Sequence, residues 1–339
     1  MSNCYIDLSI EKNNMKELYS WLDKNVEIGA VLYYDISKYN VNSKITKNVH
    51  SSKIVKGNDG DSMSVNVEPA SVNLHTHPHN CYEKENTVVG WPSGEDMREV
   101  IKFSMKGNLA HFVVTKEGTY CIQVNPLMIE SLKQMKDSDL RGAIISLIEF
   151  YFQSTHNFRT KEFQEWMKKM NKKTIKPTDF ILFCNNFELT NIESNKNNCG
   201  DVLKCNKVPL FKYTCKKTES NNKCYRQMDM KEYLDAYGDD LEIYSIDSNG
   251  DDIKKLGNGK KYLETKLPNV LSWNKYNKDV YSKSINSHKK KCNGKVVKWK
   301  PTEWFNVCFF KKNSKTMPFF RYYYDCNINL QQKFGNELK

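Results

Sequence analysis

Two histidines separated by one residue, His75 and His77, have the types and the spacing best suited to metal chemistry. They end the run SVNLHTHP (71–78), whose β-branched and apolar residues predict a β-strand. Side chains at positions i and i+2 of a strand point to the same face, so both imidazoles can bind one metal ion. The pair therefore predicts a metal site, with a surface or core role for both histidines as the alternative.

A third ligand is available in the sequence SGED (93–96), which opens a predicted helix. The carboxylate of Asp96 would complete three protein ligands, and a catalytic zinc then keeps one position for water. Zinc lowers the pKa of that water, and a proton acceptor is needed nearby. Glu27, in the predicted strand VEIGAVLYYDI (26–36), is the candidate. As alternatives, Ser93 and Asp96 also fit a helix capping box, and Glu27 fits an exposed acid after a helix.

In this order the residues resemble the motif of the JAMM (MPN+) zinc metalloproteases, which is Glu, then His-Ser/Thr-His-Pro, then Ser-x-x-Asp. Family members cleave isopeptide bonds to ubiquitin or ubiquitin-like proteins, and prokaryotic relatives cleave other peptide or amide bonds. The resemblance implies a zinc-dependent isopeptidase with one catalytic Zn²⁺. It assigns roles as follows: metal ligands His75, His77 and Asp96, proton transfer by Glu27, and oxyanion stabilisation by Ser93.

The resemblance covers roughly residues 10–125 and implies a cytidine-deaminase-like fold with α-β-α layers. One departure is that 18 residues separate the second histidine from the aspartate, more than is usual in the family. We expect the additional residues to form a loop beside the metal. His79 and Cys81 in this loop are weaker ligand candidates, and Trp91 is expected to anchor the loop or to contact substrate.

The elements that must position these residues follow from hydrophobic periodicity. Apolar residues spaced by three and four predict helices over 10–24, 92–107, 138–153 and 160–171. Alternating or β-branched runs predict strands over 26–36, 71–78 and 180–189, a hairpin over 110–124, and aromatic strands within 292–330. The predicted class is α/β, with a metalloprotease domain at 1–155, a helical connection at 156–178 and a separate basic α+β domain at 179–339.

Charge is distributed unevenly along the chain: residues 1–150 carry a net charge of −3, and residues 151–339 carry +15. The basic half is expected to position a substrate or a protein partner. A nucleic-acid interface that uses its aromatic residues is an alternative, and so is a non-catalytic MPN-type scaffold. Lys outnumbers Arg by 47 to 5, so part of the charge is attributable to AT-rich coding sequence, as in some protists and large DNA viruses.

Cysteine usage and hydropathy predict a soluble cytoplasmic protein, in the host cell if the source is viral, with reduced thiols and no membrane contact. The number of cysteines, 11, is odd, and the sequence shows no export signal, which argues against a disulfide framework. It also has no run of about 18 apolar residues that could span a membrane. A second, structural zinc is an alternative that the absence of close CxxC pairs disfavours. Its four ligands would be Cys199, Cys205, Cys215 and Cys224.

Overall fold

The structure is a computed structural model, and it describes residues 3–36, 48–61, 63–85, 87–156, 161–172, 211–213, 225–227, 242–258 and 304–325. Contacts divide the chain into two compact units. The first comprises the described residues within Met1–Pro92, Phe103–Val124 and Phe305–Lys339, and the second comprises those within Ser93–Lys102 and Asn125–Trp304.

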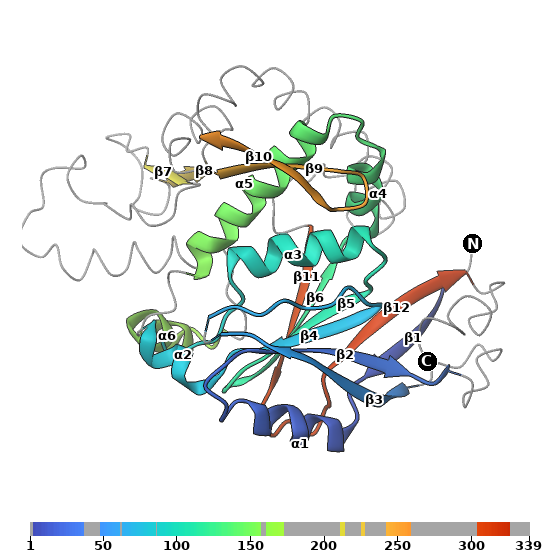
Figure 1. Cartoon of the computed structure of the whole chain (residues 1–339). Coiled ribbons are helices and arrows are strands. Elements are labelled where there is room, and N and C mark those ends of the chain that lie inside the picture. Colours follow the sequence, from blue (N-terminus) through green and yellow to red (C-terminus); the bar gives the residue numbers. More distant parts are fainter. Residues whose placement is uncertain are drawn as a thin grey trace, which may run out of the picture. The chain divides into compact units, whose positions relative to one another are not determined.

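The first unit is built on an eight-stranded sheet with the strand order β11-β6-β5-β4-β2-β3-β1-β12 (Figure 1). The pairs β4–β5 and β1–β3 are parallel, and the other neighbours are antiparallel. The strands are β1 (Asn3–Ser9), β2 (Ile28–Tyr34), β3 (Asn48–Asp59), β4 (Val72–Thr76), β5 (Ala110–Val114), β6 (Gly118–Val124), β11 (Phe305–Lys311) and β12 (Phe319–Asp325). The prediction of an α/β protein is confirmed at this level.

The sheet is strongly curled. Strands β11 and β12 lie at opposite ends of the strand order, yet residues 312–318 are all that connects them. The rings of Phe310 and Phe319 lie 5.4 Å apart, centroid to centroid. Gln123 of β6 also donates from Nε2 to the carbonyl oxygen of Arg321 in β12, at 3.3 Å. The two edges of the sheet are therefore brought close to each other.

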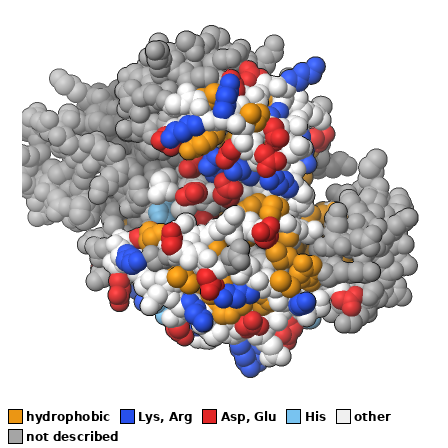
Figure 2. All heavy atoms as spheres, viewed as in Figure 1, with side chains coloured by type: hydrophobic (Ala, Val, Ile, Leu, Met, Phe, Trp, Pro, Cys, Tyr) orange, Lys and Arg blue, Asp and Glu red, His pale blue; other side chains and the backbone are white. Residues whose placement is uncertain are grey.

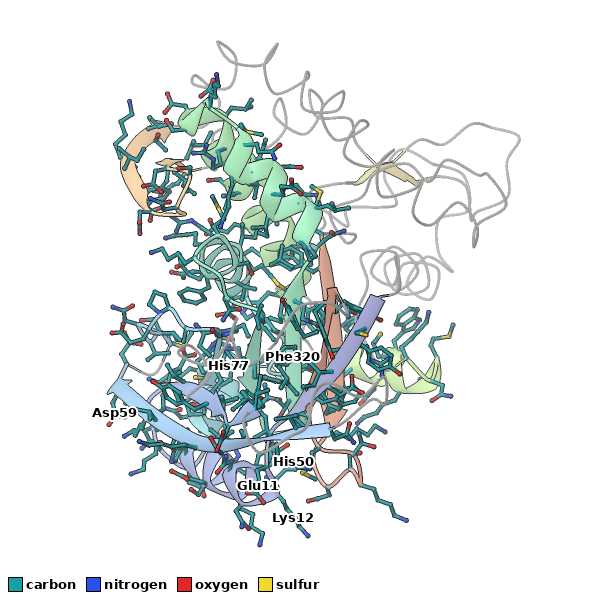
Figure 3. All side chains as sticks on the ribbon, turned by 90° about the vertical axis from the view of Figure 1, so that its right-hand side faces the viewer. Glu11, Lys12, His50, Asp59, His77 and Phe320 are labelled. Carbon is teal, nitrogen blue, oxygen red and sulfur yellow. The ribbon has the colours of Figure 1, made fainter. Side chains whose placement is uncertain are left out.

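The core of this unit lies inside the curl. Phe320 of β12 is 2% exposed, points into the interior and packs edge-on against Tyr34 (Figure 3). Helix α1 (Lys12–Trp21) adds Leu18 to the same apolar cluster, whereas Lys12 at its start points outward. The amphipathic pattern that predicted a helix over residues 10–24 is thus used to cover the sheet.

The two C-terminal strands correct the predicted domain boundaries. Aromatic strands were expected within residues 292–330, and β11 and β12 are those strands. They do not form a separate domain over residues 179–339, because β11 pairs with β6 and β12 pairs with β1. Pairing at both edges covers backbone groups that would otherwise be exposed. The predicted first domain at 1–155 is also wrong in extent, since residues 125–155 belong to the second unit.

The second unit contains helices and short hairpins. Helix α5 packs against β9, and their backbones approach so closely that a Cβ on Gly142 would lie 1.5 Å from the carbonyl oxygen of Tyr244 (Figure 1). Its elements beyond helix α3 are α4 (Pro126–Gln134), α5 (Ser138–His156), α6 (Lys161–Lys169), β7 (Phe211–Tyr213), β8 (Tyr225–Gln227), β9 (Glu242–Ile246) and β10 (Asp252–Asn258). The helices predicted over 138–153 and 160–171 are confirmed.

Charged side chains of both signs are mixed on this unit (Figure 2). Arg98 of helix α3 (Gly94–Met105) donates two hydrogen bonds to the Asp252 carboxylate, at 2.8 and 2.9 Å, and stacks on the Tyr244 ring. Burial raises the pKa of Glu149 to about 7, against the attraction of Arg98 and with further repulsion from neighbouring acids. Because the folded-state pKa is raised, this carboxyl favours folding when protonated and loses that contribution as pH rises through 7.

The cysteines of the described residues differ in their oxidation state. Cys4 is disulfide-bonded, so the prediction of reduced thiols is wrong at that position, whereas Cys81, Cys121 and Cys308 are free. The spacing of cysteines along the sequence does not show which two thiols lie close together in the fold.

The predicted strand at 180–189 and the four cysteines of the alternative second zinc lie outside the described residues. Among the described helices, none has the length and apolarity needed to cross a bilayer.

Candidate metal centre

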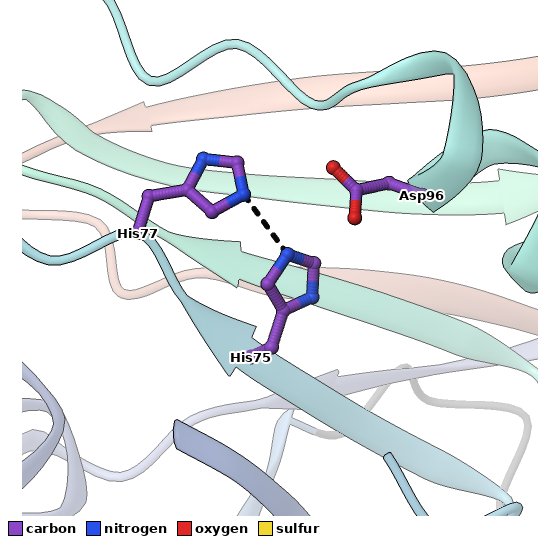
Figure 4. A group of neighbouring side chains, drawn as sticks. All are labelled: His75, His77 and Asp96. Atoms are coloured by element: carbon purple, nitrogen blue, oxygen red, sulfur yellow. Dashed lines mark hydrogen bonds between the residues drawn. The ribbon is translucent and has the colours of Figure 1, made fainter. Parts of the chain in front are cut away.

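The structure brings together the three side chains that the sequence predicted as metal ligands. His75, His77 and Asp96 each present one ligand atom, and these atoms all lie within 4.8 Å of one another (Figure 4). The imidazoles are buried, at 3% and 7% exposure, and their Nε2 atoms lie 3.0 Å apart. The carboxylate faces both rings. A group of two imidazoles and one carboxylate can hold a metal ion.

Strand register explains how Glu27 reaches this group. Antiparallel pairing aligns Gly29 of β2 with His75 of β4, so continuing the same register by two residues places Glu27 opposite His77. A hydrogen bond from the Ile28 N–H to the Thr76 hydroxyl oxygen, at 3.0 Å, maintains that alignment. Glu27 is 7% exposed, and its Oε1 lies 3.9 Å from Nε2 of His77. The predicted proton acceptor is therefore buried beside the predicted ligands.

Asp96 is held by the capping box that its spacing from Ser93 predicts. The Ser93 N–H donates to Oδ2 of Asp96 at 2.6 Å, and the Asp96 N–H donates to Oγ of Ser93 at 3.0 Å. These reciprocal bonds satisfy two donors at the start of α3. They also fix the carboxylate in place, so capping and metal binding are compatible roles. The hydroxyl proton of Ser93 is not used by the cap and can be donated elsewhere.

His77, one of the two candidate histidine ligands, is oriented by the loop that precedes α3. Nδ1 of His77 lies 3.0 Å from the carbonyl oxygen of Gly90, which can only accept a hydrogen bond. Nδ1 therefore carries the proton, and the Nε2 lone pair faces the site. The Gly90 N–H in turn donates to Glu117 at 2.7 Å, and Glu117 also accepts from the hydroxyls of Tyr82 and Tyr120. One carboxylate thus anchors the peptide that orients His77.

Gly90 provides a test of this arrangement that leaves every ligand in place. A Cβ at this position would lie 2.4 Å from the Tyr82 hydroxyl oxygen and 3.0 Å from Thr115. We expect Gly90→Ala to displace the peptide and to weaken zinc binding about 10-fold, the lower end of what the loss of an outer-shell partner costs. Competitive zinc titration would measure the change. Adding Tyr82→Phe removes the nearest colliding atom and should restore part of the affinity, and unchanged affinity in Gly90→Ala would contradict the role of this carbonyl.

The loop before α3 differs from the prediction. Residues His79–Lys84 form a short helix, α2, and a loop follows it. Nδ1 of His79 lies 3.3 Å from a carboxylate oxygen of the exposed Asp23, and neither His79 nor Cys81 belongs to the metal-ligating group of the described residues. Trp91 is 3% exposed and packs edge-on against Tyr120, with ring centroids 5.3 Å apart. Its observed role is to anchor the loop.

A third histidine that the sequence patterns did not predict lies beside the candidate ligands. Nε2 of His111, in β5, lies 2.8 Å from Nδ1 of His75. The ring is 2% exposed and stands within the apolar run AHFVV, which predicts a core strand. A polar ring in a fully buried strand was the signal available, since buried polar groups need hydrogen-bonding partners.

The donor set fits zinc. Two nitrogens and a carboxylate oxygen are ligands that zinc accepts in catalytic sites. Two nitrogen ligands on one tetrahedral zinc lie about 3.3 Å apart, given Zn–N distances of about 2.0–2.1 Å. The observed Nε2–Nε2 distance of 3.0 Å is close to that value. Identity of the metal is not fixed by these distances, because imidazole and carboxylate also bind other divalent ions.

Comparisons with known proteins add one partial relative. No family model matches the chain, and no solved structure matches it. A segment of 91 residues is 34% identical to "Uncharacterized protein 3R" of Frog virus 3 (isolate Goorha). The match covers 26% of this chain and 20% of the viral protein, so it spans about a fifth of that relative's length. The functional proposal therefore depends on the chemistry of the site and on its motif.

Proposed function

We propose that this protein is a zinc-dependent isopeptidase of the JAMM type, with a deaminase-like fold around its metal centre. The observation that carries the proposal is the group of buried His75 and His77 with half-buried Asp96, whose ligand atoms lie within 4.8 Å of one another. Glu27 beside His77 supplies the acid–base group that hydrolysis needs. All five positions of the motif are filled, which favours a catalyst over a scaffold.

The chain's own residues account for the proton transfers of amide hydrolysis. A bound zinc supplies Lewis acidity and lowers the pKa of water. Glu27 accepts a proton as water attacks the amide carbon, and it returns that proton to the amine when the carbon–nitrogen bond breaks. Ser93 donates its hydroxyl hydrogen to the oxygen that becomes negative. The products are a carboxylic acid and an amine.

Ubiquitin or ubiquitin-like conjugates are the proposed substrates, and this choice rests on the motif resemblance. Their isopeptide bonds join a C-terminal glycine carbonyl to a lysine amine, so they are amides of the kind that this constellation can hydrolyse. The basic half of the chain is proposed to contribute to the binding of a substrate or a protein partner. A cytoplasmic location is proposed together with this substrate class.

The test uses the full chain. The zinc-loaded protein would be incubated with isopeptide-linked ubiquitin dimers, with a fluorogenic amide at the ubiquitin C-terminus and with a panel of unrelated peptides. We expect hydrolysis of the ubiquitin substrates, its loss on treatment with a zinc chelator and its return when Zn²⁺ is added back. Elemental analysis of the purified protein should give about one zinc per chain.

Two outcomes would overturn the proposal. A protein that binds stoichiometric zinc but hydrolyses none of these substrates would be a scaffold with an intact metal site. A protein that retains no metal and shows no hydrolysis would have neither role. Hydrolysis of peptides but not of ubiquitin conjugates would keep the reaction and refute the substrate.

A further inference from the structure

A chain of buried polar side chains leads away from the candidate metal centre. His75 contacts His111 at 2.8 Å between Nδ1 and Nε2, and Nδ1 of His111 contacts Oδ1 of Asn73 at 2.8 Å. Asn108 donates from Nδ2 to the same oxygen at 2.9 Å. All four residues are at most 8% exposed. Water therefore cannot easily replace these partners, and the hydrogen bonds of the chain depend on one another.

Backbone carbonyls fix the direction of the hydrogen bonds that the two asparagines make in this chain. Asn73 points its Nδ2 at the carbonyl oxygen of Glu68, at 3.1 Å, and Asn108 points its Nδ2 at that of Ala70, at 2.7 Å. Carbonyl oxygens only accept, so both amide orientations are determined. Oδ1 of Asn73 is then an acceptor, and the atom that contacts it, Nδ1 of His111, must carry the proton.

The protonation of His111 in turn determines the tautomer of His75 in the candidate metal centre. A neutral His111 with its proton on Nδ1 has a lone pair on Nε2, so it accepts the hydrogen bond from Nδ1–H of His75. His75 therefore presents the lone pair of Nε2 to the site. His77 does the same through its bond to Gly90. Two lone pairs that face each other at 3.0 Å repel, and a cation between them removes the repulsion.

We propose that His111 is a positioning residue of the metal centre, which orients His75 and fixes its tautomer through the chain of Asn73 and Asn108. This inference rests on the proposed metal centre but not on the proposed reaction or substrate. Outer-shell partners of this kind fix the orientation and raise the basicity of a ligating imidazole, and their loss typically costs roughly 10–100-fold in metal affinity.

The first experiment tests the hydrogen-bond direction without any metal. In chelator-treated protein labelled with ¹⁵N-histidine, long-range ¹H–¹⁵N correlation spectra report which ring nitrogen carries the proton. Resonances of His111 would be assigned from the spectrum of His111→Gln. We expect a proton on Nδ1 alone. A proton on Nε2, or on both nitrogens, would overturn the inference whatever the metal affinity is.

The second experiment measures zinc affinity in matched variants of the full chain. His111→Leu removes the acceptor, and we expect a 10–100-fold loss of affinity. His111→Gln keeps an acceptor for His75 and a donor for Asn73, so it should recover most of that loss. Val113→Ala is the control, because Val113 is fully buried on the same strand and pairs with His75 without entering the chain.

The outcomes separate this inference from the proposed function. If His111→Leu and Val113→Ala weaken zinc binding equally, or if His111→Gln is no better than His111→Leu, packing rather than hydrogen bonding explains the effect. The inference then fails while the metal centre stands. If wild-type protein binds no zinc but His111 has its proton on Nδ1, the hydrogen-bond chain stands, but the proposed metal centre fails and the positioning role of His111 fails with it.

Discussion

Glu27→Gln is expected to lower the rate of amide hydrolysis by roughly 10²–10⁴-fold while zinc stays bound. Gln has nearly the same size as Glu and keeps a hydrogen-bond acceptor, but its amide cannot take a proton from water at neutral pH. The position is suited to such a swap because Glu27 is buried and is not in the ligand group. Its backbone is held by hydrogen bonds to Asp61 and from Gly60, which the substitution leaves intact.

The matched control is Glu95→Gln. Glu95 directly precedes Asp96 and is exposed, so the same chemical change is made beside the site without removing its proton acceptor. The rate with a fluorogenic ubiquitin amide and the zinc content would be measured for both variants. Loss of zinc in Glu27→Gln would reassign Glu27 to metal binding, and an unchanged rate would remove it from the mechanism.

Local patterns in the sequence were sufficient to predict the ligand group. The i, i+2 spacing of His75 and His77 gives a shared direction as soon as their segment is a strand. Ser93 and Asp96 signal a helix start, and that start is where the structure places them. Glu27 required one further step, the pairing of β2 with β4, which the family motif supplied in place of a local signal. The ligands were therefore predictable from short stretches of chain.

Pairings between distant segments could not be predicted in the same way. Strand β12 joins β1 across more than 300 residues, and β11 joins β6 across about 180. Hydrophobic periodicity identifies a strand but carries no information on its neighbour, and the basic composition of the C-terminal half suggested a different unit. His111 was missed for a related reason. Its contact with His75 depends on the parallel register of β4 and β5, which no local pattern encodes.

Asp96 combines a helix cap with a place among the candidate metal ligands. A capping aspartate needs one carboxylate oxygen for the Ser93 N–H, and a metal ligand needs a lone pair that faces the histidines. A carboxylate has two oxygens and a negative charge, so it can serve both purposes at once. An asparagine has one oxygen. Substitution by asparagine therefore makes the two roles compete for a single atom.

Asp96→Asn is accordingly expected to reduce zinc affinity by at least about 100-fold, the upper end of what outer-shell losses cost. We expect the amide oxygen to keep the cap, which leaves the NH₂ group, a donor without a usable lone pair, facing the imidazoles. Hydrolysis should be lost with the metal, and thermal unfolding of the metal-free protein should change little. Isothermal titration with Zn²⁺ and thermal unfolding in chelator would measure the two quantities separately.

Ser93→Ala is expected to have the opposite effects to Asp96→Asn, namely lower stability and unchanged zinc binding. Loss of the hydroxyl removes the acceptor for the Asp96 N–H and should cost about 1 kcal/mol of stability, as for other N-cap substitutions. Zinc should stay bound, because the Ser93 N–H that holds the carboxylate is a backbone group. If Ser93→Ala loses zinc as completely as Asp96→Asn does, the carboxylate is positioned by the whole cap and its separate role as ligand is refuted. If Asp96→Asn destabilises the metal-free protein more than Ser93→Ala does, without changing zinc affinity, Asp96 acts as a cap alone.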